Sequence, residues 1–209
     1  MKKKNLMKSL TALVLSVLTV LSLAACGAKP SDGGKDEDKD GYTVAIIKQM
    51  DHASLDEIAN AITAQLDAIA QEQNVSIRYT ITSGQGDQSV LKQLADQAVA
   101  DKVDAIIPIA TTAAQVAAVA AEDSRTPVVY AAISDPDTAK LTGIDYVTGT
   151  SDALNTEYIL GMMLAQDPGV SKVGLLYSLS EPNSTKPIAE AKAYLEQHGI
   201  TCVEQTANT

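Results

Sequence analysis

The chain has 209 residues, of which 45% are hydrophobic, and a formal net charge of −10. This length allows a sizeable buried core. The acidic balance argues against nucleic acid as a partner and against binding an anionic membrane surface through charge.

The first 25 residues have the pattern of a secretory signal. Four lysines precede an apolar run from Leu10 to Leu23, which is short for a spanning helix. The run ends in Leu-Ala-Ala before Cys26, which predicts a lipoprotein signal, with 1–25 removed and Cys26 acylated. An ordinary signal peptide with a chance cysteine is the alternative. Residues 1–25 hold no acidic residue, so their removal lowers the charge from −10 to −14.

Residues 26–41 are expected to form the acylated cysteine and a disordered acidic tether. The stretch "GAKPSDGGKDEDKDG", residues 27–41, has one alanine as its only apolar residue and cannot contribute to a core. A flexible chain of this length reaches about 20 Å. The prediction places the protein on the extracytoplasmic face of the bacterial cell membrane, anchored by lipid. Cys202 then has no intrachain partner and is expected to be a buried free thiol.

From Tyr42, short β-branched runs alternate with helical patterns. Capping boxes at Ser54 with Glu57 and at Thr112 with Gln115 mark two helix starts. Apolar strands in strict alternation with helices predict an α/β lobe, residues 42–148, with a parallel sheet covered on both faces. Strands are expected at 42–48, 75–81, 104–109 and 127–131, and helices at 54–73, 88–100 and 112–121.

The alternation of strand and helix patterns begins again after Gly149 and predicts a second α/β lobe, residues 149–209. Helices are expected at about 152–166 and 184–198, and strands at 172–178 and 201–205. Two strands and two helices are too few to cover a doubly wound sheet on both faces. The sequence therefore predicts an incomplete second lobe.

The stretch "TSGQGDQS", residues 82–89, resembles the start of a dinucleotide-binding turn. Three requirements fail: Ser89 stands where the third glycine belongs, the turn follows the second strand, and the acidic Asp104 begins the next strand instead of ending it. Gly84 and Gly86 are expected to supply positive φ for a tight turn, and Asp87 to cap the following helix.

No catalytic or metal-binding set is found in the sequence. The two histidines, His52 and His198, are not accompanied by a Ser/His/Asp set, an HExxH motif or a Cys/His cluster. His198 lies near a helix C-terminus, where the helix dipole favours it, and is expected to be structural. No enzymatic activity, metal or cofactor is expected.

Ligands of an open parallel sheet bind beyond the carboxyl ends of its strands. There, Thr111 and Thr112 offer hydroxyls and free N–H groups at a helix start, which suit a carboxylate; N-capping by Thr112 is the alternative. Asp152, expected to open a helix, could accept an ammonium group or serve as an N-cap.

The segments "VAIIKQMDHASLDEI", "SGQGDQS", "DAIIPIATTAAQ", "PVVYAAISDP", "VTGTSD" and "VGLLYSLSEPNS" occur in this order. Together they resemble the substrate-binding lipoproteins of ABC importers typified by tryptophan/tyrosine-binding proteins. The resemblance spans residues 42–209 and implies two Rossmann-like lobes of the type I periplasmic-binding-protein architecture. The loop "DHASLD" departs from the usual "EHPALD", which puts the cleft shape at the first strand in doubt.

The resemblance also implies a site and a function. Thr111 and Thr112 would hold a ligand carboxylate, and Asp152 would pair with its ammonium. The remaining expected cleft residues are Gln49, Met50, Ser134, Asp135, Glu181, Asn183 and Ser184. The expected protein is a monomeric receptor that captures an amino acid, with an aromatic one favoured, and delivers it to an ABC permease. A sugar or nucleoside receptor, or a secreted α/β enzyme or sensor domain, remains an alternative. Because part of the second lobe is missing, ligand binding by this chain is expected to be weak or absent.

Overall fold

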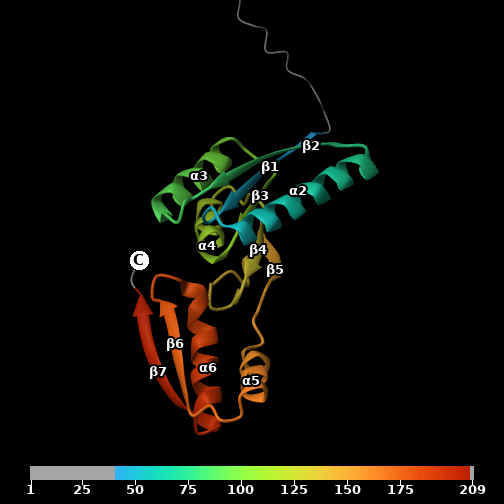
Figure 1. Ribbon diagram of the computed structural model, residues 1–209. Helices are drawn as coiled ribbons and strands as arrows, with labels where there is room; N and C mark the ends of the chain where they lie inside the picture. Colours follow the sequence, from blue (N-terminus) through green and yellow to red (C-terminus); the bar gives the residue numbers. More distant parts are fainter. Residues whose placement is uncertain (1–40, 208–209) are drawn as a thin grey trace, which may run out of the picture. The chain divides into compact units, whose positions relative to one another are not determined.

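A computed structural model describes residues 41–207 (Figure 1). The predicted signal peptide, the acylation of Cys26 and the tether up to residue 40 lie outside the described residues. Gly41 was assigned to the tether, but it begins the first strand and pairs with Ser76 of the second. The first strand therefore begins one residue earlier than predicted.

The first lobe is a five-stranded parallel sheet with helices between its strands, which confirms the predicted α/β class. The strand order is β2-β1-β3-β4-β5, and every neighbouring pair is parallel. The elements are β1 (Gly41–Lys48), α2 (Ala53–Gln73), β2 (Ser76–Ser83), α3 (Gln88–Ala100), β3 (Ala105–Ile109), α4 (Thr111–Ala120), β4 (Val128–Ile133) and β5 (Val147–Ser151).

Strand β5 was not predicted from the sequence. Its residues, VTGTS, contain one apolar side chain, and four of the five are exposed at the sheet edge, so no buried run marks the strand. The lobe boundary expected between residues 148 and 149 falls inside β5, and the first sheet extends to Ser151. The pairing with β4 shifts register between Tyr130 and Ile133.

Alternate residues of the central strand β1 pack on opposite faces of the sheet. Val44 and Ile46 pack with Ala59 of α2, whereas Ala45 and Ile47 pack with Leu91 of α3 and with residues of α4. Figure 1 shows α2 (teal) and α3 (green) on either side of β1. Burial on both faces explains why β1 reads as a nearly continuous apolar run.

The second lobe pairs two parallel strands with two helices. Its elements are α5 (Thr156–Gln166), β6 (Lys172–Ser178), the single-turn 3-10 helix η1 (Pro182–Ser184), α6 (Thr185–Gln197) and β7 (Thr201–Ala207). Leu160 of α5, Ala191 and Leu195 of α6 and Ile200 form its buried core. Strands β6 and β7 and helix α6 begin within one residue of their predicted positions, whereas α5 begins four residues later than predicted.

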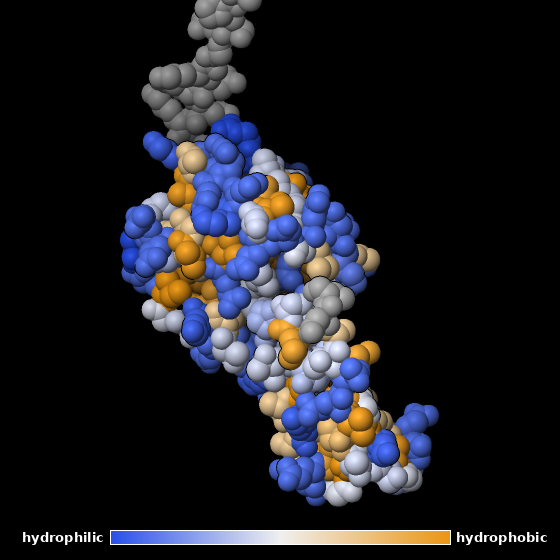
Figure 2. Space-filling view, turned by 90° about the vertical axis from the view of Figure 1, so that its left-hand side faces the viewer, coloured by the Kyte–Doolittle hydropathy of each residue, from blue (hydrophilic) through white to orange (hydrophobic). Residues whose placement is uncertain are grey.

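The second lobe leaves apolar side chains uncovered. Leu176 on β6 is 73% exposed and Val203 on β7 is 48% exposed, although parallel sheets are normally covered on both faces. On α5, Tyr158 and Met162 are also exposed. The face of the molecule drawn in Figure 2 shows apolar surface, in orange, among the polar surface of both lobes.

Helices α2 and α5 begin at other residues than predicted. His52 is the N-cap of α2, and its Nδ1 accepts a hydrogen bond from the N–H of Ser54 at 3.2 Å. Ser54 therefore lies inside the helix and forms no capping box. Asp152 does not open a helix, because α5 begins at Thr156 and is capped by Asn155, whose side chain accepts from the N–H of Tyr158 at 2.9 Å.

His198 and Cys202 both contact residues of the second lobe. The ring of His198 stacks on Tyr194 with centroids 4.1 Å apart, and its Nδ1 lies 2.7 Å from the Tyr194 carbonyl oxygen. Cys202 is free, as predicted, but half-buried rather than buried. Within residues 41–207, no helix has the length and apolar character needed to cross a bilayer.

Candidate functional site

The carboxyl edge of the first sheet brings most of the predicted site residues together. Gln49 follows β1, Thr111 follows β3, Ser134 follows β4 and Asp152 follows β5. Neighbouring strands of a sheet lie about 5 Å apart, so these side chains share one strip of the molecule. The strip holds polar groups of both kinds, N–H donors and carboxylate acceptors.

The turn after β2 lies beside this strip and is held by hydrogen bonds. Asp87 caps α3, as predicted, by accepting from the N–H groups of Ser89 at 2.7 Å and Val90 at 3.4 Å. These backbone bonds hold the pKa of the Asp87 carboxyl below its usual value. Gly86 has a φ of +76°, which confirms the predicted positive φ there, and its N–H bonds to the Gln49 carbonyl at 2.9 Å.

Gly84 is required for another reason than the predicted positive φ. A Cβ atom at this position would lie 2.3 Å from Cδ2 of Leu91, which is fully buried, and 3.1 Å from the Gln49 carbonyl oxygen. The absence of a side chain lets the turn pack against both α3 and the end of β1.

The N-terminus of α4 is capped by the side chain of Gln49, the residue that follows β1. Oε1 of Gln49 accepts a hydrogen bond from the N–H of Thr112 at 3.1 Å, and Gln49 is only 8% exposed. The predicted N-cap at Thr112 is wrong because α4 begins at Thr111, which puts Ala110 at the N-cap position. Ala110 has a φ of 78°, a strained conformation for a residue other than glycine.

Asp152 is exposed and lies at the outer end of the strip. Its backbone N–H bonds to the Ile133 carbonyl at 3.1 Å, and its Oδ1 accepts from the hydroxyl of Ser134 at 3.3 Å. Among the described residues, no lysine or arginine forms an ion pair with Asp152. Its negative charge is therefore available to a cationic group.

Asp135, in contrast, is fully engaged. Its carboxylate accepts from the N–H groups of Asp137 at 3.0 Å and Thr138 at 3.1 Å and from the Thr138 hydroxyl at 3.0 Å. It also forms an ion pair of 3.0 Å with Nζ of Lys186. Lys186, together with the Thr138 bonds, lowers the pKa of Asp135 to about 2.

The expected residues of the second lobe lie around η1. Nε2 of Gln49 lies 3.4 Å from Oε2 of Glu181 in hydrogen-bonding geometry. The Ser184 hydroxyl donates to the carbonyl oxygens of Glu181 and Ser178 and so holds the loop itself. Asn183 is exposed to solvent within η1.

Met50 lies beside the turn after β2. Its Cε would be 3.5 Å from a Cβ built on Gly86. The side chain is half-buried, so it can offer apolar surface next to the polar strip.

Two lysines at this edge were not identified from the sequence. Lys48 forms ion pairs with Asp56 and with Asp51, the latter at 3.0 Å, and these contacts raise its pKa, Asp56 more than Asp51. Lys186 lies in the first turn of α6, where the helix dipole disfavours a cation. That unfavourable position is the sequence signal that could have indicated a carboxylate partner.

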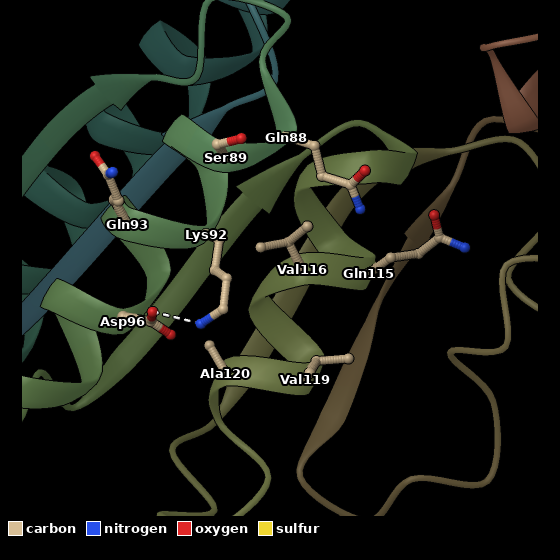
Figure 3. A pocket seen from close by; sticks show the side chains of 9 residues that line it. All are labelled: Gln88, Ser89, Lys92, Gln93, Asp96, Gln115, Val116, Val119 and Ala120. Atoms are coloured by element: carbon tan, nitrogen blue, oxygen red, sulfur yellow. Dashed lines mark hydrogen bonds and ion pairs between the residues drawn. The ribbon is translucent and has the colours of Figure 1, made fainter.

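A groove of about 690 Å³ between α3 and α4 is lined by other residues than those of the strip. Figure 3 shows Val116 and Ala120 of α4 on the side of a Lys92–Asp96 ion pair on α3, whereas the side chain of Val119 points away from that pair. The two charges are 2.6 Å apart and pair with each other, and the other polar residues of the lining, Gln88, Ser89, Gln93 and Gln115, are uncharged. We assign it no ligand.

Comparison with known proteins gives consistent matches. A family model described as "ABC transporter substrate binding protein" matches residues 43–209. A curated relative, the "Tyrosine-binding protein" of Clostridioides difficile (strain R20291), is 28% identical over 212 residues, which cover 97% of this chain and 61% of the relative.

Solved structures agree with the predicted fold. An ABC domain from Streptococcus pneumoniae in complex with L-Trp is 34% identical, with a TM-score of 0.71 over 80% of this chain and 57% of that one. A conserved domain protein from Vibrio cholerae is 27% identical, with a TM-score of 0.72 over 79% of this chain and 57% of that one. The chain thus spans about three fifths of the length of these relatives, and the predicted type I periplasmic-binding-protein-like fold is confirmed.

Proposed function

Because the chain belongs to the ABC transporter substrate-binding protein family, we propose that it is the solute-binding part of an importer and that it captures an amino acid. The observation that carries the proposal is the polar strip at the sheet edge. There the N-terminus of α4, held by Gln49, lies on the same edge as the exposed carboxylate of Asp152.

The spacing of these groups suits a zwitterion. The N-terminus of α4 favours an anion through the helix dipole and through the first-turn N–H groups that Gln49 does not cap, and Asp152 favours a cation. Strands β3 and β5 are two positions apart in the sheet, which corresponds to about 10 Å. An α-carboxylate and an α-ammonium, each with a hydrogen bond of about 3 Å, fit between groups at that separation. A sugar or a nucleoside does not carry a carboxylate and an ammonium together, so it would leave these groups without charged partners.

An aromatic side chain on the ligand is supported by the relatives. The pneumococcal structure holds L-Trp and the clostridial relative is named for tyrosine. In this chain Thr111 and Thr112 would receive the carboxylate and Asp152 the ammonium. Gln49, Met50, Ser134, Glu181, Asn183 and Ser184 would lie around the remainder of the ligand.

The cellular setting follows from the same proposal. The protein would act outside the cytoplasm, anchored to the bacterial membrane by acylated Cys26, and would deliver its ligand to a permease without chemical change. We propose that it acts as a monomer, with a first lobe that ends at Ser151 and a second lobe after it.

Ligand-detected NMR on the purified protein tests the proposal, because saturation transfer detects binding even when affinity is low. L-Tryptophan and L-tyrosine should give saturation-transfer signals, and glucose and adenosine should not. Asp152→Asn should weaken binding about fivefold or more by removing the partner of the ammonium. Asp167→Asn, which alters an exposed carboxylate after α5, is the matched control and should bind normally. Equal signals from the sugar and the amino acids would contradict the proposal.

A further inference from the structure

Two polar contacts join the first lobe to the residues on either side of η1. Nε2 of Gln49 reaches Oε2 of Glu181 at 3.4 Å, and Asp135 pairs with Nζ of Lys186 at 3.0 Å. Glu181 precedes η1 and Lys186 follows it, so the two contacts flank this single turn. The η1 segment also lies against α4.

The orientation of the Gln49 carboxamide is fixed at both ends. The N–H of Thr112 can only donate, so the atom that faces it must be Oε1, and Nε2 then points to Glu181, whose carboxylate can only accept. The main chain of Gln49 is also fixed, because its N–H bonds to the Ile109 carbonyl at 3.1 Å and its carbonyl accepts from Gly86. A buried side chain in this position cannot turn freely when η1 approaches.

The second contact is the Asp135–Lys186 ion pair, in which hydrogen bonds also fix the side chain from the first lobe. The Asp135 side chain is 13% exposed and is held by the bonds from Asp137 and Thr138, whereas the Lys186 side chain is 50% exposed and projects from α6. Neither Lys186 nor Glu181 contributes to the buried core of the second lobe. Their contacts with the first lobe therefore do not serve to fold the lobe that carries them.

We propose that Asp135–Lys186 and Gln49–Glu181 form a two-point latch that holds η1 over the N-terminus of α4. The inference rests on the proposed function and adds to it: the protein closes on its ligand partly through contacts that the ligand does not supply. Gln49 is then a positioning residue for closure, linking Glu181 to the helix start that receives the carboxylate. Asp135 serves the latch, which leaves the ligand ammonium to Asp152.

Distance measurements between the lobes test the latch without any ligand. Two fluorophores are attached to cysteines introduced at exposed Asp123 in the first lobe and Glu196 in the second, in a Cys26→Ser, Cys202→Ser background. Single-molecule energy transfer then reports the distribution of interlobe distances. Because no ligand is present, the result for the latch does not depend on whether the protein binds an amino acid. Failure of the latch can therefore be distinguished from failure of the proposed function.

Charge reversal at Lys186 should open the lobes. Lys186→Glu places two carboxylates together and should shift the main distance population to longer values. The matched control is Lys192→Glu, which breaks an ion pair of 2.7 Å with Glu204 inside the second lobe at nearly the same exposure, 47%. The control should leave the distances unchanged. An equal shift in both variants, or in neither, would overturn the proposal.

A reciprocal exchange tests the Gln49 contact. Gln49→Glu still accepts from Thr112 but repels Glu181, so the lobes should open. Adding Glu181→Gln restores one donor facing one acceptor and should return the distances to those of the parent protein. If the double variant stays as open as the single one, Gln49 acts only on its own lobe and the latch is contradicted.

Discussion

Oε1 of Gln49 accepts the N–H of Thr112 at 3.1 Å, so a residue that follows the first strand caps the helix that follows the third. The two residues are 63 positions apart in the sequence, and Ala110 offers no cap of its own. The first turn of α4 is thus held by the same side chain that reaches toward Glu181. One carboxamide thus contacts both the start of α4 and the loop before η1.

Replacing Gln49 should cost the stability of a lost helix cap. Gln49→Leu keeps the approximate volume but leaves the Thr112 N–H without its acceptor, which should lower the free energy of unfolding by about 1 kcal/mol. For a domain of this size the melting temperature should fall by about 2–4 °C. Thr112→Ala, which leaves the bond to the backbone N–H intact, should change it little. A larger loss in Thr112→Ala would show that the threonine hydroxyl is the important group.

A methyl group at Gly84 should destabilise the first lobe. Gly84→Ala places Cβ against the buried Leu91, and overpacking of this kind costs about 1–3 kcal/mol. Gly174→Ala is the matched control, because a Cβ there would meet no atom within 4 Å, and its effect should stay within about 0.5 kcal/mol. Urea denaturation of both variants checks this, and similar midpoints would contradict the role given to Gly84.

The latch should respond to salt more than to pH. The pKa of Asp135 is about 2 when folded, below the ordinary value of about 3.9, so its contribution is present above about pH 4 and is lost only as pH falls through about 2. The pKa of Lys186 is raised above 10.5, so its contribution is present below that value and is lost as pH rises through the higher one. Interlobe distances should therefore be constant from about pH 4 to 10.

Salt acts on the same ion pair through screening. Because Lys186 is half exposed, raising the ionic strength to about 1 M, where the screening length is about 3 Å, should lengthen the interlobe distance at neutral pH. The Lys186→Gln variant, which has no charge to screen, should show no such response. A salt response of equal size in that variant would contradict the assignment.

The lipid anchor can be checked directly. Cells expressing the full chain and supplied with a clickable palmitate analogue should label the protein, and membranes should retain it. Cys26→Ala should abolish the labelling and release or block processing of the protein, whereas Cys202→Ala should not. Labelling that persists in Cys26→Ala would contradict the predicted acylation.

Much of the first lobe could be predicted from sequence because its inner strands, β1, β3 and β4, contain buried apolar residues. The apolar residues of β1 and the capping role of Asp87 are local signals, and both are found in the structure. Strand β5 was not predicted because its one apolar residue, Val147, gives no periodic pattern. Edge strands of this kind are specified by backbone pairing with a neighbour.

The missed features of the site depend on contacts distant in sequence. The cap of α4 comes from Gln49, and the partner of Asp135 is Lys186 on another lobe. No spacing rule connects these pairs, since the fold alone brings them together. The resemblance to a known family indicated the right edge of the sheet, but only the structure separates Asp135, which is engaged, from Asp152, which is available.

Competitive binding of three related compounds tests the central claim, recognition of a zwitterion, most directly. L-Tryptophan, tryptamine and indole-3-propionate share the indole ring, but tryptamine lacks the carboxylate and indole-3-propionate lacks the ammonium. The account predicts that L-tryptophan binds more tightly than either, and that Asp152→Asn reduces its advantage over indole-3-propionate while its advantage over tryptamine remains. Equal binding of all three compounds to the parent protein would contradict the account.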